Sequence, residues 1–208
     1  MGRDPRPVAD GAIYHLMARG NRRQPIFLDD DDRKMFLRML SRVCVRYGWT
    51  CYGYCLMGNH IHLAIKTPVG NLPEGMRHLL GRYAWLHNQS HGIADHLFRS
   101  RYLSVLIESD EQLISVIRYI ARNPLRGGLV ERAEDWPWAS YPALLGKDKP
   151  IAGFEPAETL AVFSDRPWLG RAALRGLVED DNPRRDRWPA VYLAKSVTIV
   201  GTRRKGHS

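Results

Sequence analysis

The chain has 208 residues, with 44% hydrophobic and 25% charged residues and a formal net charge of +9. This length and apolar content suit one compact domain with a small extension, and they exclude a chain that is disordered throughout. No uncharged apolar run reaches the roughly 18 residues that a membrane helix needs, and the first residues lack an apolar signal-peptide stretch. We therefore expect a cytoplasmic protein without a membrane partner.

The positive charge is unevenly distributed along the chain. Residues 1–130 and 171–208 are basic, whereas residues 131–170 between them are acidic. An excess of Lys and Arg favours a polyanionic partner, because each side chain that neutralises a phosphate releases a counterion. Charge alone leaves open a basic protein that is simply soluble.

The first predicted elements are a strand and an amphipathic helix. Residues 13–19 form the strand, which ends at the turn dipeptide Gly20-Asn21. The helix spans residues 31–47, where apolar residues recur at helical spacing, and Gly48 ends it. Four aspartates at 29–32 place negative charge where this helix begins. We interpret them as a helix cap and solvated loop rather than as a carboxylate metal site.

A hairpin follows, and then two helices separated by a strand. Residues 49–56 and 60–66 alternate as two strands, with a turn between them. The later predicted elements are a helix at 74–90, a strand at 102–107 and a helix that begins near Ser109 and runs to about Asn123. Pro124 and then Gly127-Gly128 are the residues predicted to stop this last helix. The order β-α-β-β-α-β predicts an α+β, ferredoxin-like sheet with two helices over one face, followed by this additional helix.

The signal is weaker beyond residue 130. Residues 136–141, Trp-Pro-Trp-Ala-Ser-Tyr, predict an aromatic segment that wraps around the core, and short helices are expected at 157–163 and 169–178. We therefore divide the chain into a domain of residues 1–146 and a basic C-terminal extension, residues 147–208, of unknown fold.

Three cysteines, Cys44, Cys51 and Cys55, lie close together in the sequence. Their odd number and the expected reducing compartment argue against a disulfide framework. Alternation along a strand places Cys51 and Cys55 on one face, but no second cysteine pair follows to complete a metal site. We interpret all three as buried thiols.

The most informative side chains are His60 and His62, set against Tyr119 and Asn123. On a strand the two histidines project to one face, opposite an aliphatic face, and two imidazoles there can chelate one divalent ion. Tyr119 and Asn123 fall one turn apart at the edge of a helix's apolar stripe. Taken singly, a His-x-His pair is more often structural, a tyrosine of this kind more often packs, and an asparagine before proline more often ends a helix.

The motifs around these residues resemble those of a known family. Residues 56–63, Leu-Met-Gly-Asn-His-Ile-His-Leu, resemble the M-P-N-H-V-H-L signature of the single-tyrosine HUH transposases. Residues 118–130 resemble the Y-I-x-x-N-P-V-R-A-G-L-V signature of their REP-associated (RAYT) branch. The resemblance covers about residues 10–146. Three backbone or packing positions depart from these signatures without affecting a candidate ligand or nucleophile: Gly58, Leu125 and Gly127.

The resemblance implies a transposase, an enzyme that nicks single-stranded DNA and transfers strands. His60 and His62 would bind Mg²⁺ or Mn²⁺, with Asn123 as a third ligand, and Tyr119 would attack a DNA phosphodiester to give a 5′-phosphotyrosine link and a free 3′-OH. The implied partner is hairpin-containing single-stranded DNA of repetitive palindromic elements. The protein would be nucleoid-associated and a monomer or homodimer. Six arginines would contact DNA: Arg19, Arg22, Arg23, Arg118, Arg122 and Arg126.

Other histidines and tyrosines have more ordinary interpretations. His87 and His91 would share a helix face and could bind Zn²⁺, but no cysteine or acidic residue at a fitting distance completes the site. We interpret this pair as structural or close to DNA. Unpaired bases could stack on Tyr52 or Tyr54, although packing in the sheet is the more common role.

Two other functions stay open. A domesticated protein with the same fold could bind hairpin DNA without transposition activity, although intact His60, His62, Tyr119 and Asn123 argue against it. A metal-dependent phosphoesterase could use water as its nucleophile, and replacing Tyr119 by Phe would then spare its activity.

Overall fold

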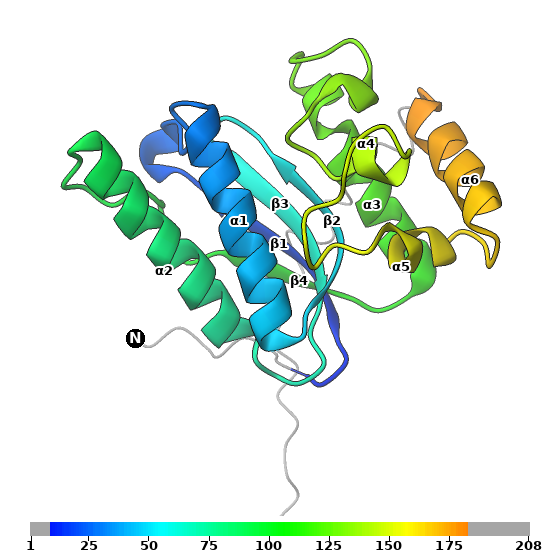
Figure 1. Ribbon diagram of the computed structural model, residues 1–208, viewed down its shortest axis with the longest axis horizontal. Coiled ribbons are helices and arrows are strands. Elements are labelled where there is room, and N and C mark those ends of the chain that lie inside the picture. Colours follow the sequence, from blue (N-terminus) through cyan, green and yellow to red (C-terminus); the bar gives the residue numbers. More distant parts are fainter. Residues whose placement is uncertain (1–8, 183–208) are drawn as a thin grey trace, which may run out of the picture.

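The computed structural model describes residues 9–182 (Figure 1). Four strands form one sheet: β1 (Ile13–Arg19), β2 (Thr50–Leu56), β3 (His60–Lys66) and β4 (Leu103–Ile107). The longer helices are α1 (Asp30–Tyr47), α2 (Leu72–His91), α3 (Asp110–Arg126) and α6 (Pro167–Glu179). The short ones are η1 (Asn21–Arg23), η2 (Ala133–Asp135), α4 (Tyr141–Leu144) and α5 (Pro156–Ala161). Within this described part of the chain, no helix combines the length and the apolar character that crossing a membrane requires.

The sheet is antiparallel and has the strand order β2-β3-β1-β4. Helices α1 and α2 lie side by side across one face, and α3 packs against β2 and β3 from the other side (Figure 1). This is the α+β, ferredoxin-like arrangement that the order of elements predicts, with α3 as the additional helix.

The register of β1 and β3 sorts their side chains between the two faces. Leu16 of β1 pairs with Leu63 of β3, and both are fully buried. Because neighbours in a strand point to opposite faces, Met17 and its partner His62 lie on the face toward α3. The aliphatic face of β3 therefore packs on α1 and α2, and its polar face is turned toward the helix that carries Tyr119.

A later segment of the chain covers the edge strand β2. The backbone N–H of Leu56 donates to the carbonyl of Trp138, and the N–H of Ser140 donates to the carbonyl of Tyr54. Residues 136–141 therefore wrap around the core as the sequence predicts, and part of the segment adds to the sheet like a short strand.

Local signals account for most helix ends. The side chain of Asp29 accepts a hydrogen bond from the N–H of Asp32 and caps α1, and Gly48 ends this helix with a left-handed φ of 65°. Helix α3 continues past Pro124 to Arg126, beyond the predicted end at about Asn123, and Gly127, one of the predicted stop residues, is its C-cap. Proline lacks an N–H and removes one helical hydrogen bond, but the N–H of Gly127 still reaches the carbonyl of Asn123 and closes the last turn.

A β-bulge in β2 separates Cys51 from Cys55. Cys51 pairs with Ile65 of β3, and the neighbouring residue of β3, Ala64, pairs with Gly53. The residue between Cys51 and Gly53 therefore has no partner of its own in β3. The alternation shifts there, and Cys51 and Cys55 lie on opposite faces, contrary to the prediction from a regular strand. All three cysteines are buried and free, as expected, and burial raises the pKa of Cys44 to about 12.

Residues beyond 146 pack onto the same core as the sheet. Four apolar side chains from this region are buried in it: Phe154, Leu160, Leu174 and Val178. The helices expected at 157–163 and 169–178 correspond to α5 and α6, and α6 lies beside α3 (Figure 1). The division of the chain at residue 146 stays a prediction. The last part of the predicted basic extension, residues 183–208, lies outside the described residues.

We expect Gly75→Ala in α2 to destabilise the protein. A Cβ at Gly75 would lie 2.1 Å from Cζ2 of Trp49, whose indole is buried and donates to the side-chain oxygen of Asn71. The ring would have to move, so we expect a loss of about 1–3 kcal/mol in urea unfolding. Gly81→Ala on the same helix is the matched control, because its Cβ would meet no other atom. The higher helix propensity of alanine should raise the free energy of unfolding by roughly 0.5–1 kcal/mol. Equal effects of the two changes would contradict this expectation.

Candidate active site

Three histidines gather on the side of the sheet that faces α3. His60 and His62 come from β3, which places both on one face as the alternation predicts, and His15 comes from the neighbouring β1. Nε2 of His15 lies 3.0 Å from Nδ1 of His62, and both side chains are buried. The ring centroids of His60 and His62 are 5.1 Å apart, and the two rings are nearly perpendicular.

Tyr119 reaches this cluster from α3. Its half-buried ring stands edge-on to His62, with 5.3 Å between ring centroids, and to His15 at 5.8 Å. The guanidinium of Arg126 lies over the tyrosine ring, 4.9 Å from its centroid. Three segments far apart in the sequence thus bring a phenol, imidazoles and a cation together.

Burial favours the neutral form of the three imidazoles. Desolvation lowers the pKa of His60 to about 4 and that of His15 to about 3, and it holds the pKa of His62 well below its ordinary value. The positive charge of Arg19 lowers the pKa of His60 and His62 further. A neutral imidazole keeps a lone pair for a cation, so these rings are competent as ligands at neutral pH.

The hydrogen bonds indicate which nitrogen each ring offers to a cation. Nδ1 of His60 lies 2.7 Å from the side-chain oxygen of Asn59, an acceptor, so His60 donates through Nδ1 and keeps its lone pair on Nε2. Nδ1 of His62 is hydrogen-bonded to His15, which leaves Nε2 of His62 as the second nitrogen that can bind the cation. Two imidazole nitrogens fit a divalent cation, and they suit Mn²⁺ better than Mg²⁺.

Asn123, the predicted third ligand, is buried one turn after Tyr119 on α3. Its side-chain Nδ2 donates to the carbonyl of Tyr119 at 2.9 Å, which holds the amide close to the backbone of the tyrosine. Oδ1 is then the atom with which Asn123 could bind a cation, because an amide oxygen is the ligand atom of asparagine. This role of Asn123 stays a prediction.

Four of the six arginines predicted to contact DNA are exposed: Arg19, Arg22, Arg23 and Arg126. Arg22 and Arg23 have left-handed φ values of 50° and 62°, which residues other than glycine rarely adopt. Asn59 holds this turn by donating from its side chain to the carbonyl of Arg23 at 3.0 Å. The turn is thereby tied to the residue that precedes His60, although its contact with phosphate stays a prediction.

The other two arginines, Arg118 and Arg122, are buried and serve the fold instead. Arg118 donates to the backbone carbonyls of Leu177 and Asp180, and Arg122 donates to that of Val178. The last carbonyls of a helix lack partners within the helix, and α6 ends here. We therefore correct the prediction of DNA contacts at these two positions: their guanidinium groups attach α6 to the helix that carries the tyrosine.

We expect Arg118→Met to weaken the attachment of α6 and to destabilise the protein. Methionine keeps an apolar stem but removes a buried charged donor from two carbonyls. Hydrogen bonds to charged groups contribute about 1.5–3 kcal/mol each, so we expect a loss of roughly 2–4 kcal/mol in urea unfolding. Arg42→Met, at an exposed position of α1, is the control and should change stability by less than about 0.5 kcal/mol. A loss as small as that of the control would show that other contacts hold α6.

Tyr52 and Tyr54 are both buried in β2. The ring of Tyr54 stands edge-on to that of Phe154, with 5.7 Å between centroids, and burial is the main cause that raises the pKa of both tyrosines. The two side chains therefore pack in the core, which is the more common role of such tyrosines. They do not offer a surface on which bases could stack.

His15 is a residue of this cluster that we did not predict from the sequence. The signal was present, because His15 alternates with the buried residues Tyr14 and Leu16 and therefore lies on the polar face of its strand. What the sequence does not contain is the register that sets β1 beside β3 and brings His15 to His62. His15 positions His62 through their shared hydrogen bond.

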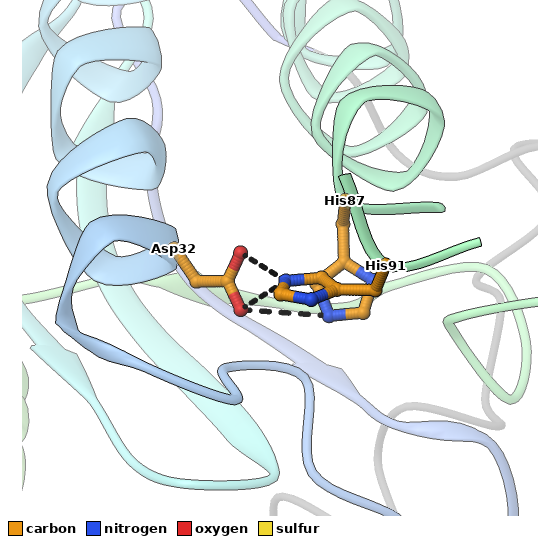
Figure 2. Close-up of side chains that lie close together, drawn as sticks. All are labelled: Asp32, His87 and His91. Atoms are coloured by element: carbon orange, nitrogen blue, oxygen red, sulfur yellow. Dashed lines mark hydrogen bonds and ion pairs between the residues drawn. The ribbon is translucent and has the colours of Figure 1, made fainter. Parts of the chain in front are cut away.

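Asp32 is the acidic residue that lies beside His87 and His91. It is too far from them in the sequence for spacing to reveal it. We expected it to belong to a solvated cap, but it is 3% exposed, and its carboxylate oxygens lie 3.0 Å from Nε2 of His91 (Figure 2). Asp32 comes from α1 and the histidines from α2, so only the packing of these helices reveals the group.

Comparison with known proteins covers the part of the chain that forms this cluster. The model of a family described as "Transposase IS200 like" matches residues 9–123, more than half of the chain. Among curated proteins, one named as a REP-associated tyrosine transposase, from Haemophilus influenzae, is 24% identical over 152 residues, which are 65% of this chain and 83% of that protein.

Two solved structures extend the comparison. A REP-associated tyrosine transposase bound to a REP hairpin has a TM-score of 0.61 at 17% identity, over 73% of this chain and 90% of that chain. A transposase from Deinococcus radiodurans has a TM-score of 0.39 at 18% identity, over 54% of this chain and 91% of that chain. The first of these likenesses shows a shared fold.

Proposed function

The chain belongs to the family of IS200-like transposases, and on this premise we propose that it cleaves and rejoins single-stranded DNA beside hairpins, with Tyr119 as the nucleophile. The resemblance to REP-associated tyrosine transposases is confirmed by the curated relative and by the similar solved structure. The observation that carries the proposal is the position of the Tyr119 ring against His62, which brings the candidate nucleophile to the candidate metal ligands.

The reaction follows from the chemistry of a phenol beside a phosphodiester. Oη of Tyr119 attacks the phosphorus and loses its proton to solvent, while the bond from phosphorus to the 3′ oxygen breaks and that oxygen takes up a proton. The 5′ phosphate stays on Tyr119 and a free 3′-OH is left. Because one ester bond has replaced another, a second 3′-OH can attack the phosphotyrosine and join strands without ATP.

His60 and His62 are the residues that would hold a divalent cation, with Asn123 as a third ligand. When bound there, Mg²⁺ or Mn²⁺ supplies a Lewis acid that polarises the phosphate. His15 keeps His62 in place through the bond at Nδ1, and Asn59 does the same for His60. These two partners keep the ring Nε2 atoms available.

We further propose hairpin DNA as the substrate. A solved structure of similar fold belongs to a protein bound to a REP hairpin. In this chain, exposed arginines are held at residues of the candidate site: Arg22 and Arg23 lie in the turn tied to Asn59, and Arg126 lies over the Tyr119 ring. Arginine suits contacts to phosphate because its planar fork donates two hydrogen bonds.

Labelled DNA tests the proposal. Single-stranded hairpins from the gene's own neighbourhood, labelled at either the 5′ or the 3′ end, are incubated with the protein and Mn²⁺ and run on denaturing gels. We expect the 3′ label to move with the protein, because the fragment with the 5′ phosphate is the one that becomes linked. Cleavage without a protein adduct would favour a phosphoesterase that uses water. Hairpin binding without cleavage would favour a domesticated hairpin-binding protein.

A further inference from the structure

A second group of possible metal ligands joins α1 to α2. Asp32 lies in the first turn of α1, and His87 and His91 lie one turn apart near the end of α2. One ligand atom from each residue lies within 4.8 Å of the other two. Figure 2 shows both imidazoles turned toward the carboxylate. This group, the Asp32 cluster, belongs to the helical layer on the opposite side of the sheet from Tyr119 and is separate from the candidate active site.

The spacing of the Asp32 cluster suits a small tetrahedral cation. Nε2 of His91 lies 3.0 Å from both oxygens of Asp32, and Nε2 of His87 lies 3.7 Å from Oδ2. Ligand atoms about 2.0–2.1 Å from a tetrahedral Zn²⁺ ion are roughly 3.3 Å from one another, a value between these two distances. Small side-chain rotations would therefore place all three around one ion.

The chemistry of the donors selects the type of cation. Two imidazoles and one carboxylate suit Zn²⁺, whereas Mg²⁺ prefers oxygen ligands. Histidines at i and i+4 present their rings on one side of a helix. The N–H of Leu28 donates to Oδ2 of Asp32 at 2.8 Å and orients the carboxylate, which is the kind of outer support that metal ligands have.

His87 provides a second, independent observation. Its side chain is 1% exposed, yet neither ring nitrogen has a hydrogen-bond partner among the residues that the structure describes. Buried polar groups are almost always paired, so this one needs an explanation. Desolvation lowers the pKa of His87, which keeps the ring neutral and a lone pair available. A bond from Nε2 to a cation would satisfy the nitrogen that now makes a 3.7 Å contact.

We propose that Asp32, His87 and His91 bind one Zn²⁺ ion, with water as the fourth ligand. The ion ties the start of α1 to the end of α2 and stabilises the fold, independently of the proposed DNA chemistry. It also holds the segment before α1, because the N–H of Leu28 donates to Oδ2 of Asp32. In the same segment the N–H of Ile26 donates to the carbonyl of Gly58, which lies before β3.

Zinc binding by the full-length, metal-stripped protein tests this proposal without DNA. Bound Zn²⁺ per chain is measured by mass spectrometry after dialysis against buffered free Zn²⁺, for the wild type, His91→Ala, Asp32→Asn and His78→Ala. His78 lies on the same helix outside the Asp32 cluster and is the matched control. His91 is 20% exposed, so its truncation should leave the fold intact, which circular dichroism checks.

We expect His91→Ala and Asp32→Asn each to bind about one equivalent less than the wild type, and His78→Ala to bind as much as the wild type. Because His60 and His62 could also take up Zn²⁺, the difference between variants, and not the total, reports on this site. With Co²⁺ in place of Zn²⁺, the absorption typical of tetrahedral coordination should appear in the wild type and be reduced in His91→Ala. If His91→Ala binds as much Zn²⁺ as His78→Ala, the proposal is overturned.

Discussion

Tyr119→Phe should abolish the covalent adduct between protein and DNA. Phenylalanine keeps the ring that stands against His15 and His62 but removes the hydroxyl, the atom proposed to attack phosphorus. Loss of a nucleophile lowers the rate of covalent catalysis by orders of magnitude, and we expect strand transfer to fall at least about 10³-fold. The measurement is the yield of the 3′-labelled adduct over time on denaturing gels.

A matched control removes the same atom elsewhere in the chain. The hydroxyl of Tyr141 is buried and has no hydrogen-bond partner among the described residues, so Tyr141→Phe should leave the adduct yield unchanged. DNA binding should survive in both variants, since neither change removes a positive charge. If Tyr119→Phe still cleaves DNA at the wild-type rate, the nucleophile is not this tyrosine.

His60→Ala should remove most of the cation-dependent activity while the protein stays folded. His60 is partly exposed, and its removal leaves the bond between His15 and His62 in place. A Lewis acid contributes several kcal/mol to a transition state, and each 1.36 kcal/mol changes a rate tenfold, so we expect a loss of about 10²–10³-fold. The measurement is the adduct yield as a function of Mn²⁺ concentration.

His78→Ala is again the comparison, because His78 contacts Tyr47 and takes no part in the histidine cluster around Tyr119. It should keep both the maximal yield and the Mn²⁺ concentration at half-maximal yield. Excess Mn²⁺ should restore part of the activity of His60→Ala, because His62 would still offer one ligand atom. A dependence on Mn²⁺ equal to that of the wild type would show that His60 does not hold the cation.

The strands and helices could be predicted because their signals are local. β1 and β3 have the predicted bounds, 13–19 and 60–66, since apolar and polar residues alternate in both and turn residues follow or precede them. The bulge in β2 could not be predicted, because an extra residue in one strand shows only against its partner. The extension of α3 beyond Pro124 likewise depends on how its last turn closes.

The site could be predicted in two separate halves. One motif indicated His60 and His62, and a second motif, far along the chain, indicated Tyr119. The structure brings these two halves together. His15 and Asp32 were missed because their roles depend on which strand lies beside β3 and which helices pack together. The positive charge of Arg118 suggested a DNA contact, because the sequence does not show that this guanidinium donates to a carbonyl of α6.

The segment that pairs with β2 also restricts how copies of this chain could assemble. Backbone groups of Trp138 and Ser140 already bond the free side of β2, so this edge is occupied. At the other edge of the sheet, β4 pairs with β1 alone among the described strands. An open strand edge is a template for a further strand. A dimer that continues one sheet into the next therefore cannot pair strands along the part of β2 that Trp138 and Ser140 occupy, and among the described residues β4 is the edge of the sheet on which no further strand lies.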